Sequence, residues 1–265
     1  MLEAGVGSLS AHERREAIAR LVDADARVSV ADLTVRFGVT DASIRRDLIL
    51  LEETGRLRRI HGGAVSPTAR VASGVYASKN RVRREEKGRI AAAAARLVAP
   101  GDVVMFDSGT TVASMAASIP APLRAPNAFT AVTWSLPVLD ELGSWEAPHL
   151  VVVGGLYLPD YRAFVGPQAI AALSELTADV VFLGCDGLSV DAGLTTPHVL
   201  VAEVGAVAAA RARRVVALAD GSKLGRAGFT PIVPLARLDV LITDAGADPE
   251  RVDEIRAAGV EVVLA

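Results

Sequence analysis

Beyond residue 100, four short polar segments each follow an apolar run, and the first carries the groups of an anion site. Asp107-Ser108-Gly109-Thr110-Thr111 stands between the run VVMF and a helical pattern. Hydroxyl groups, a glycine that allows close backbone approach and the free N–H groups of a helix N-terminus can cradle a phosphate, here without the lysine of a P-loop. The pattern alone is weak, because Ser, Gly and Thr also cap ordinary helices.

The other three segments carry an acid, a hydroxyl pair and a lysine. They are Gly184-Cys185-Asp186-Gly187, Gly193-Leu194-Thr195-Thr196 and Asp220-Gly221-Ser222-Lys223. Ligands of open α/β sheets bind beyond the carboxyl ends of the strands, so the four segments could surround one phosphorylated polyol. Each aspartate could instead cap a turn, and Lys223 could be solvated. Cys185 is expected to be a small buried residue rather than a nucleophile, because no histidine lies close in sequence.

The first sixty residues predict three helices with short connections. The first runs from 11 to 25, the second from a cap at Ser29 to Gly38, and the third from Thr40 or Asp41 to Gly55. Glycine is the residue best able to adopt the left-handed conformation that ends a helix. Two short helices joined by a tight turn form a helix-turn-helix, whose second helix enters the major groove of DNA.

Burial of Ile44, Leu48 and Leu51 would leave a basic face at the start of the third helix. Arginine can bond guanine through its planar fork or clamp a phosphate. Gly55–Ile60 then alternates basic and apolar residues, as a wing hairpin would. The alternative is an ordinary solvated basic face. The residues expected to contact DNA are Thr40, Asp41, Ser43, Arg45, Arg46, Arg56, Arg58, Arg59 and His61.

Composition restricts the class of protein. The 265-residue chain has a net charge of -3, so any contact with nucleic acid must come from a local basic patch. With 51% hydrophobic and 4% aromatic residues it is typical of a soluble globular protein with two domains. One cysteine excludes an internal disulfide, and four histidines show no metal-ligand spacing, so we expect neither metal nor cofactor. The N-terminus lacks a signal-peptide pattern and no apolar run reaches about 18 residues, which favours the cytoplasm.

The rest of the chain predicts an α/β domain. A helix near 86–97 is followed by seven short apolar runs with helical segments between several of them, which indicates a largely parallel sheet covered on both faces. Between 67 and 85 the periodicity fades, and the segment KNRVRREEK is strongly charged. We therefore expect a winged helix-turn-helix domain over 1–66, a linker over 67–85 and an α/β domain over 86–265.

These motifs resemble the DeoR family of bacterial transcription regulators. The N-terminal match comprises Val39-Thr40, Ser43-Ile44-Arg45-Arg46-Asp47-Leu48, Leu51-Glu52, Gly55 and Arg59-Ile60-His61-Gly62-Gly63-Ala64. The C-terminal match comprises Glu86-Lys87, Asp107 to Thr111, Val132-Thr133, Gly154-Gly155, Gly166, Gly193 to Thr196, Glu203, Asp220, Ser222-Lys223 and Ile242-Thr243-Asp244.

The resemblance implies a repressor of a carbohydrate-catabolic operon that releases its double-stranded operator when a phosphorylated sugar binds. It also implies a sensor fold shared with ribose-5-phosphate isomerase, and an oligomer, dimer or tetramer. Two positions depart from the family pattern: Trp134 stands where Asn is common and Gly205 where Lys is frequent, so Trp134 is expected to reshape the pocket. The residues that would bind the effector are Asp107, Ser108, Gly109, Thr110, Thr111, Asp186, Thr195, Thr196, Glu203 and Lys223.

A different class of function is also open at this stage. A sugar-phosphate isomerase or related enzyme could use Asp186 and Glu203 as acid and base, with Lys223 on the charge that develops in the transition state. Such an enzyme has no need of the segment 29–64, whereas an effector-controlled regulator uses both halves of the chain. Repression and activation are not separable from the sequence.

Overall fold

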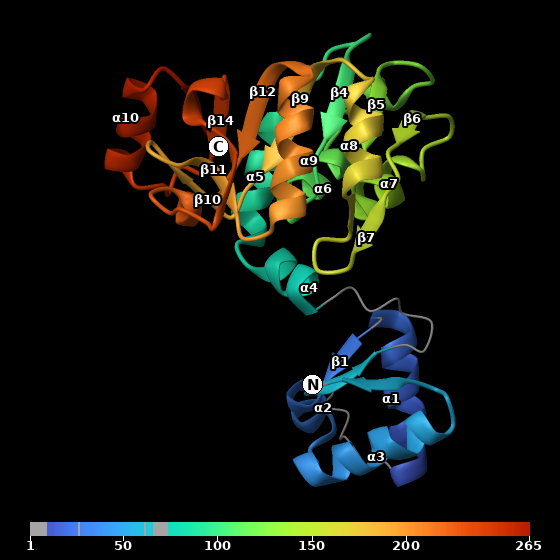
Figure 1. The fold of residues 1–265 in the computed structure, drawn as a ribbon. Helices are drawn as coiled ribbons and strands as arrows, with labels where there is room; N and C mark the ends of the chain where they lie inside the picture. The colour runs from blue at the N-terminus through green and yellow to red at the C-terminus, as the bar shows by residue number, and fades with distance from the viewer. Residues whose placement is uncertain (1–9, 26, 61, 66–73) are drawn as a thin grey trace, which may run out of the picture. The chain divides into compact units, whose positions relative to one another are not determined.

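The computed structural model describes residues 10–25, 27–60, 62–65 and 74–265. The chain divides into two compact units, Met1–Val71 and Ala72–Ala265, and the elements of each are labelled in Figure 1. Each unit has a hydrophobic core of its own. The first contains the predicted helix-turn-helix, and the second contains the predicted α/β fold.

The first unit is a winged helix-turn-helix. Ile18, Leu33, Ile44 and Leu48 are buried together at the centre of its core. Its three helices match the predicted spans, and its three short strands form an antiparallel sheet in the order β1-β3-β2. The elements are α1 (Ala11–Asp25), β1 (Arg27–Ser29), α2 (Val30–Phe37), α3 (Asp41–Glu53), β2 (Arg58–Ile60) and β3 (Gly63–Val65).

Side-chain caps set the ends of the two central helices. The Ser29 hydroxyl accepts a hydrogen bond from the Asp32 backbone N–H at 3.0 Å, and Thr40 does the same for Ser43 at 3.3 Å. Between the helices, Gly38 has φ +62°, the left-handed conformation predicted for it. These caps confirm the predicted turn and fix the start of α3.

The third strand of the wing sheet was not predicted. β1 pairs with β3, and the backbone of Gly63 lies so close to it that an added Cβ would collide with the Val28 carbonyl oxygen. This close approach explains why a glycine stands at residue 63.

The second unit is built on seven parallel strands, which correspond to the seven apolar runs. Their order is β15-β14-β12-β9-β4-β5-β6, so the chain starts in the middle at β4, builds outward to β6 and then crosses to β9 on the other side. The strand order therefore reverses between β4 and β9. The strands are β4 (Val103–Phe106), β5 (Thr130–Thr133), β6 (His149–Val152), β9 (Ala178–Gly184), β12 (Ala212–Leu218), β14 (Val240–Thr243) and β15 (Glu261–Leu264).

Helices cover both faces of this sheet (Figure 1). Val104 and Phe106 pack with α5, α6 and α7 on one face, while Met105 packs with the cluster that holds α8, α9 and α10. This alternation is the period of a strand buried on both faces. The helices are α5 (Arg84–Ala95), α6 (Thr110–Ala117), α7 (Leu136–Leu142), α8 (Pro167–Ser174), α9 (Val199–Ala210) and α10 (Pro249–Ala257).

Two small antiparallel sheets border the large one. One is the hairpin of β7 (Leu156–Leu158) and β8 (Ala163–Val165). The other has the order β10-β11-β13, formed by Gly187–Ser189, Gly193–Thr196 and Thr230–Val233. Three short 3-10 helices complete the unit: η1 (Ala121–Arg124), η2 (Gly221–Lys223) and η3 (Leu235–Arg237).

The segment predicted to be a linker contains a helix. α4 spans Gly74–Arg81 and belongs to the second unit. Its charged sequence has little helical amphipathicity, so its structure depends on tertiary contacts that sequence periodicity does not reveal. Within the described part of the chain, none of the helices is long and apolar enough to span a membrane.

Candidate functional site

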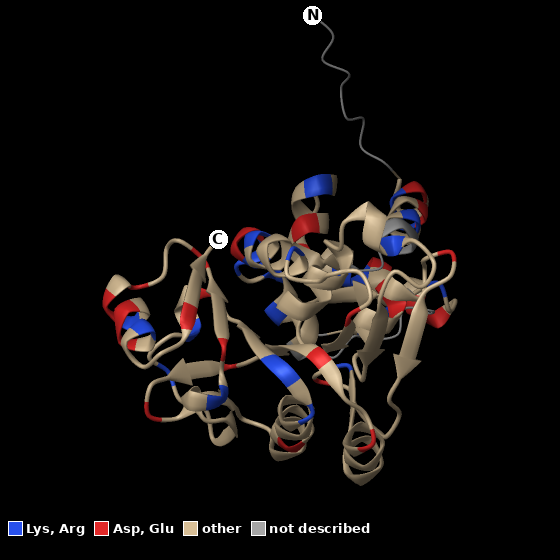
Figure 2. Ribbon diagram, turned by 90° about the horizontal axis from the view of Figure 1, so that it is seen from above, with Lys and Arg blue, Asp and Glu red and all other residues tan. Residues whose placement is uncertain are grey.

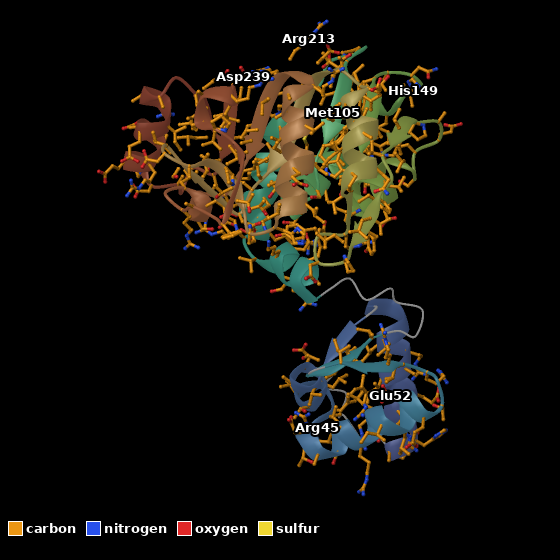
Figure 3. The ribbon with its side chains drawn as sticks, viewed as in Figure 1. Arg45, Glu52, Met105, His149, Arg213 and Asp239 are labelled. Carbon is orange, nitrogen blue, oxygen red and sulfur yellow. The ribbon has the colours of Figure 1, made fainter. Side chains whose placement is uncertain are left out.

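The recognition surface of the first unit is the exposed start of α3. Arg45 and Arg46 are both exposed, and the Arg45 guanidinium lies 3.5 Å from the Asp41 carboxylate, an (i, i+4) pair at the surface (Figure 3). The Ser43 hydroxyl lies 3.1 Å from that of Thr40. Exposed pairs of this kind are weak, so Arg45 can leave Asp41 for a base or a phosphate.

The aspartate that follows the two arginines has a structural role that the sequence did not reveal. Asp47 is 3% exposed, and its carboxylate accepts hydrogen bonds from Arg14 Nε at 2.6 Å and Arg15 Nη1 at 3.4 Å. These bonds join α3 to α1. Asp47 therefore sets the orientation in which α3 presents its basic face.

The wing arginines fall into two groups. Arg59 donates from its backbone N–H and from Nε to Glu52 at 2.8 and 2.7 Å, and these bonds lower the pKa of Glu52 (Figure 3). Arg56 lies 3.5 Å from Glu16. Arg58 is exposed on β2 and, like Arg46, has no acidic partner among the described residues. His61, predicted to contact DNA, lies outside the described residues.

In the second unit a cavity of about 200 Å³ opens where the strand order reverses, at the carboxyl ends of β4, β9 and β12. This is the topological switch point at which ligands of doubly wound sheets bind. Eight of the ten predicted effector residues line it: Asp107, Ser108, Gly109, Thr110, Thr111, Asp186, Thr196 and Lys223.

One side of the cavity is the start of α6. Gly109 has φ +132° and precedes Thr110, the first residue of the helix, and no described side chain caps the N-terminal N–H groups. Ser108, Thr110 and Thr111 are buried along this turn. An anion placed here meets backbone N–H groups, hydroxyls and the positive end of the helix dipole.

Asp107 sits directly beneath this turn. Its Oδ2 accepts the Gly184 N–H at 3.0 Å, and its Oδ1 accepts the indole N–H of Trp134, also at 3.0 Å. Burial raises the pKa of Asp107 to about 7, although these hydrogen bonds oppose the rise. Trp134 is 1% exposed and does not line the cavity, so it acts on the cavity through Asp107 rather than by filling it.

The opposite side of the cavity centres on Asp186. Thr196 Oγ1 donates to Asp186 Oδ2 at 3.1 Å, and the Tyr161 hydroxyl lies 3.4 Å from Thr196 Oγ1. Lys79 Nζ donates to Asp186 Oδ1 at 2.5 Å and lies 5.1 Å from the centre of the Tyr161 ring. Lys79 and Tyr161 were not predicted as site residues. Lys79 belongs to the charged segment KNRVRREEK, which was expected to be a linker, and no sequence motif indicates a role for Tyr161.

A third group of polar and charged residues also lines the cavity. Ser222 Oγ donates to Asp220 at 2.5 Å, and burial lowers the pKa of Lys87, which also lines the cavity. Burial raises the pKa of the Cys185 thiol to about 12, so this lining residue stays a neutral thiol near pH 7. No group of His, Cys, Asp and Glu within the described ranges could hold a metal ion.

Two family models match the chain. The DeoR-like helix-turn-helix domain matches residues 14–70, and the DeoR C terminal sensor domain matches residues 82–245. The chain belongs to the DeoR family. It is a DNA-binding transcriptional regulator with a sensor domain, which confirms the resemblance and the fold class predicted from the sequence.

DeoR-type relatives match nearly end to end. The HTH-type transcriptional regulator GlpR of Haloferax volcanii is 38% identical over 252 residues, 95% of this chain and 96% of the relative. The HTH-type transcriptional repressor GlcR of Bacillus subtilis is 31% identical over 252 residues, 95% of each chain. The enzyme alternative is set aside, because these relatives and the matched family are regulators.

Among solved structures, ribose 5-phosphate isomerase A from Methanocaldococcus jannaschii matches with a TM-score of 0.39 and 20% identity, over 53% of this chain and 54% of that chain.

Two residues predicted from the DeoR resemblance are not brought to the cavity. Glu203 is exposed on α9, because the neighbouring Val201, Ala202 and Val204 turn inward. Thr195 is buried beside the cavity, where its hydroxyl donates to the Gly187 carbonyl at 3.0 Å and accepts the Gly228 N–H at 2.6 Å. In the structure, Thr195 therefore holds two loops together.

The second departure from the DeoR pattern has a packing explanation. A Cβ added at Gly205 would lie 2.7 Å from Cγ2 of Ile232, which lines the cavity. A lysine at this position would therefore require Ile232 to move. In this chain Gly205 lets α9 pack closely against β13.

Proposed function

We propose that this DeoR-family regulator represses a carbohydrate-catabolic operon and releases its operator when a phosphorylated sugar binds the sensor cavity. The observation that carries the proposal is the cavity itself, which has a backbone and hydroxyl anion cradle on one side and the Asp186–Thr196 pair on the other. A phosphorylated polyol has an anion at one end and hydroxyl groups at the other. The name of the repressor GlcR, a relative along the whole chain, supports repression rather than activation.

On the DNA side, α3 would enter the major groove. Arg46 would read a base edge, because it is exposed and free of acidic partners among the described residues. Arg45 would also contact a base edge once its pair with Asp41 is broken. Arg58 on β2 would contact the phosphate backbone. Thr40, Asp41 and Ser43 would flank these contacts at the helix start, while Arg56, Arg59 and His61 remain proposed wing contacts.

On the ligand side, the turn from Ser108 to Thr111 would hold the phosphate. Asp186 would accept hydrogen bonds from sugar hydroxyls and Thr196 would donate to them, and Lys223 would add positive charge. Asp107, beneath the cradle, would position the turn through its bond to Gly184.

The proposal includes an oligomer in the cytoplasm, where phosphorylated sugars and the operator are found together. Two helix-turn-helix units related by a two-fold axis would bind half-sites about 10 base pairs apart, or a multiple of that spacing. Ligand binding can release DNA only if the released state binds the sugar more tightly, by roughly 1–3 kcal/mol of coupling free energy.

Fluorescence anisotropy of the full-length protein on its own upstream DNA tests this function. A panel of sugar phosphates is titrated into the preformed complex, and one of them is expected to release the DNA. Transcription from the same promoter with and without the protein separates repression from activation. Tight DNA binding that no sugar phosphate disturbs would refute the ligand class, and no binding to the upstream DNA would refute the regulatory assignment for that site.

A further inference from the structure

Helix α4 forms part of the wall of the ligand cavity. Tyr76, Ser78 and Lys79 from this helix, and Val82 just after it, line the cavity beside residues of the sheet. α4 lies against α6, whose first turn is the anion cradle. A ligand held by the cradle would therefore meet α4 as well.

The buried ring of Tyr76 and several polar contacts hold α4 in place. Among the described residues, none from α4 belongs to the two hydrophobic clusters of the sensor unit. Instead Lys79 Nζ donates to Asp186 at 2.5 Å, and Lys87 Nζ donates to the Lys79 carbonyl oxygen at 2.5 Å. The ring of Tyr76 lies 5.7 Å from the Arg162 guanidinium. Helix docking that depends on charge responds to a charged ligand.

The joint after α4 is conformationally unusual. Arg83 has φ +53°, a left-handed backbone conformation that residues other than Gly, Asn and Asp seldom adopt. It lies between α4 and α5. Its guanidinium lies 3.7 Å from the buried carboxylates of both Asp220 and Asp244. The angle between the two helices is therefore set by charged groups at the ends of β12 and β14.

The charges that line the cavity determine how strongly Lys79 contributes to binding an anion. The lining holds three lysines, Lys79, Lys87 and Lys223, against four aspartates, Asp107, Asp160, Asp186 and Asp220. Without Lys79, only Lys87 and Lys223 remain among the lining lysines to attract an anion. With α4 in place, the added cation lies in a partly buried site, where its attraction for an anion is stronger than at the surface.

We propose that Lys79 is an effector-binding residue carried into the cavity by α4, so that binding of a phosphorylated ligand holds α4 on the sensor unit. The proposal rests on the proposed function and adds its mode of regulation. α4 is the first described element after the DNA-binding unit in the chain, so the ligand would act on the sensor element that lies nearest in sequence to the helix-turn-helix.

The experiment compares three variants of the full-length chain. Lys79→Met removes the ammonium group and keeps an unbranched stem. Arg81→Met makes the same kind of change at an exposed residue of the same helix, and Lys223→Met removes a lining lysine that is not on α4. Binding of inorganic phosphate is followed by calorimetry, and backbone hydrogen exchange is measured over residues 74–83.

We expect phosphate to slow exchange in α4 of the wild type and of Arg81→Met. Lys79→Met is expected to bind phosphate roughly tenfold or more weakly, because it loses a charge-assisted contact. Its α4 should exchange rapidly with or without phosphate. Lys223→Met should also weaken binding, but phosphate at saturation should still slow exchange in α4.

Two results would overturn the proposal and leave the proposed function standing: equal phosphate affinity in Lys79→Met and wild type, or faster exchange in α4 when phosphate binds. The second result would mean that the ligand displaces Lys79 from Asp186. A wild-type chain that binds neither inorganic phosphate nor any sugar phosphate would overturn both proposals.

Discussion

The two units of this regulator place their functional groups in opposite ways. On α3 the basic side chains project from a continuous stretch of sequence, and that of Arg45 is 59% exposed. In the sensor unit the polar groups are buried or partly buried and come from distant segments; Lys79 and Asp186, which touch, are 107 residues apart. Surface groups contribute to affinity with little effect on stability, whereas buried polar groups contribute to both.

Acidic and basic residues are spread over the sensor unit (Figure 2), and several of them form ion pairs at the surface. On α10, Arg251 pairs with Glu254 at 2.8 Å and Arg256 with Asp253 at 3.3 Å. Such pairs add little to stability. The contrast between the units therefore depends on the few charges that are buried.

The most severe test of the contrast is Asp47, a buried charge in the unit whose function is otherwise on the surface. Asp47→Ala leaves Arg14 without its partner at 2.6 Å and is expected to lower the free energy of unfolding of the DNA-binding unit by roughly 3–5 kcal/mol. Calorimetric unfolding of the full-length chain measures the effect. Asp41→Ala, which removes an exposed carboxylate from the same helix, is the control and should change stability by less than about 0.5 kcal/mol. Equal effects of the two variants would refute the structural role of Asp47.

A second prediction concerns pH and the buried acid of the sensor. Burial raises the pKa of Asp107 from 3.8 to about 7, so between these pH values the folded chain keeps a proton that the unfolded chain has lost. Stability from this group is therefore highest below pH 4, falls by about 4 kcal/mol as the pH rises through about 7, and then levels off.

Asp107→Asn should remove this pH dependence of the sensor unit, which thermal unfolding between pH 5 and 8 would detect. Asp160→Asn changes an exposed carboxylate that lines the same cavity and should leave the dependence in place. If Asp107→Asn keeps the wild-type pH profile, Asp107 is not the group that titrates.

Surface arginines should affect DNA binding alone. Arg46→Ala is expected to weaken operator binding by roughly 1–3 kcal/mol and to relax the base preference at one position, with the unfolding temperature unchanged. Anisotropy titrations on operator variants measure both. Weaker binding by the same factor on every sequence would assign Arg46 to a phosphate instead.

The smallest effect is expected at the wing. Arg58→Ala should lower affinity for all sequences alike and reduce the slope of log affinity against log salt concentration by about one. Arg59→Ala makes a comparison within the same strand, because Arg59 is already bound to Glu52 at 2.7 Å. If the salt slope changes more in Arg59→Ala, the roles of the two arginines are reversed.

The sequence predicted the groups that depend on local rules. Ser29 and Gly38 signal helix ends through their own side chain and backbone, and the seven strands follow from continuous apolar runs. Cavity residues at strand ends could be predicted because the switch point of a parallel sheet gathers them.

Features that depend on tertiary contact could not be predicted. α4 was expected to be a linker because its residues lack periodicity, and Lys79 reaches Asp186 only when the fold is complete. Trp134 was expected to reshape the pocket, but the bond from its indole N–H to the buried Asp107 could not be predicted. Glu203 was assigned to the ligand on resemblance, and the rotation of α9 turns it to solvent.

The central claim is that the cavity and the α3 surface are coupled. Isothermal calorimetry of a sugar phosphate that releases the operator, with and without saturating operator DNA, measures this coupling directly. Because linkage is reciprocal, the sugar phosphate should bind the DNA-bound protein weaker by the same factor by which it weakens DNA binding, about 5- to 150-fold. Equal affinity in the two titrations would contradict the account.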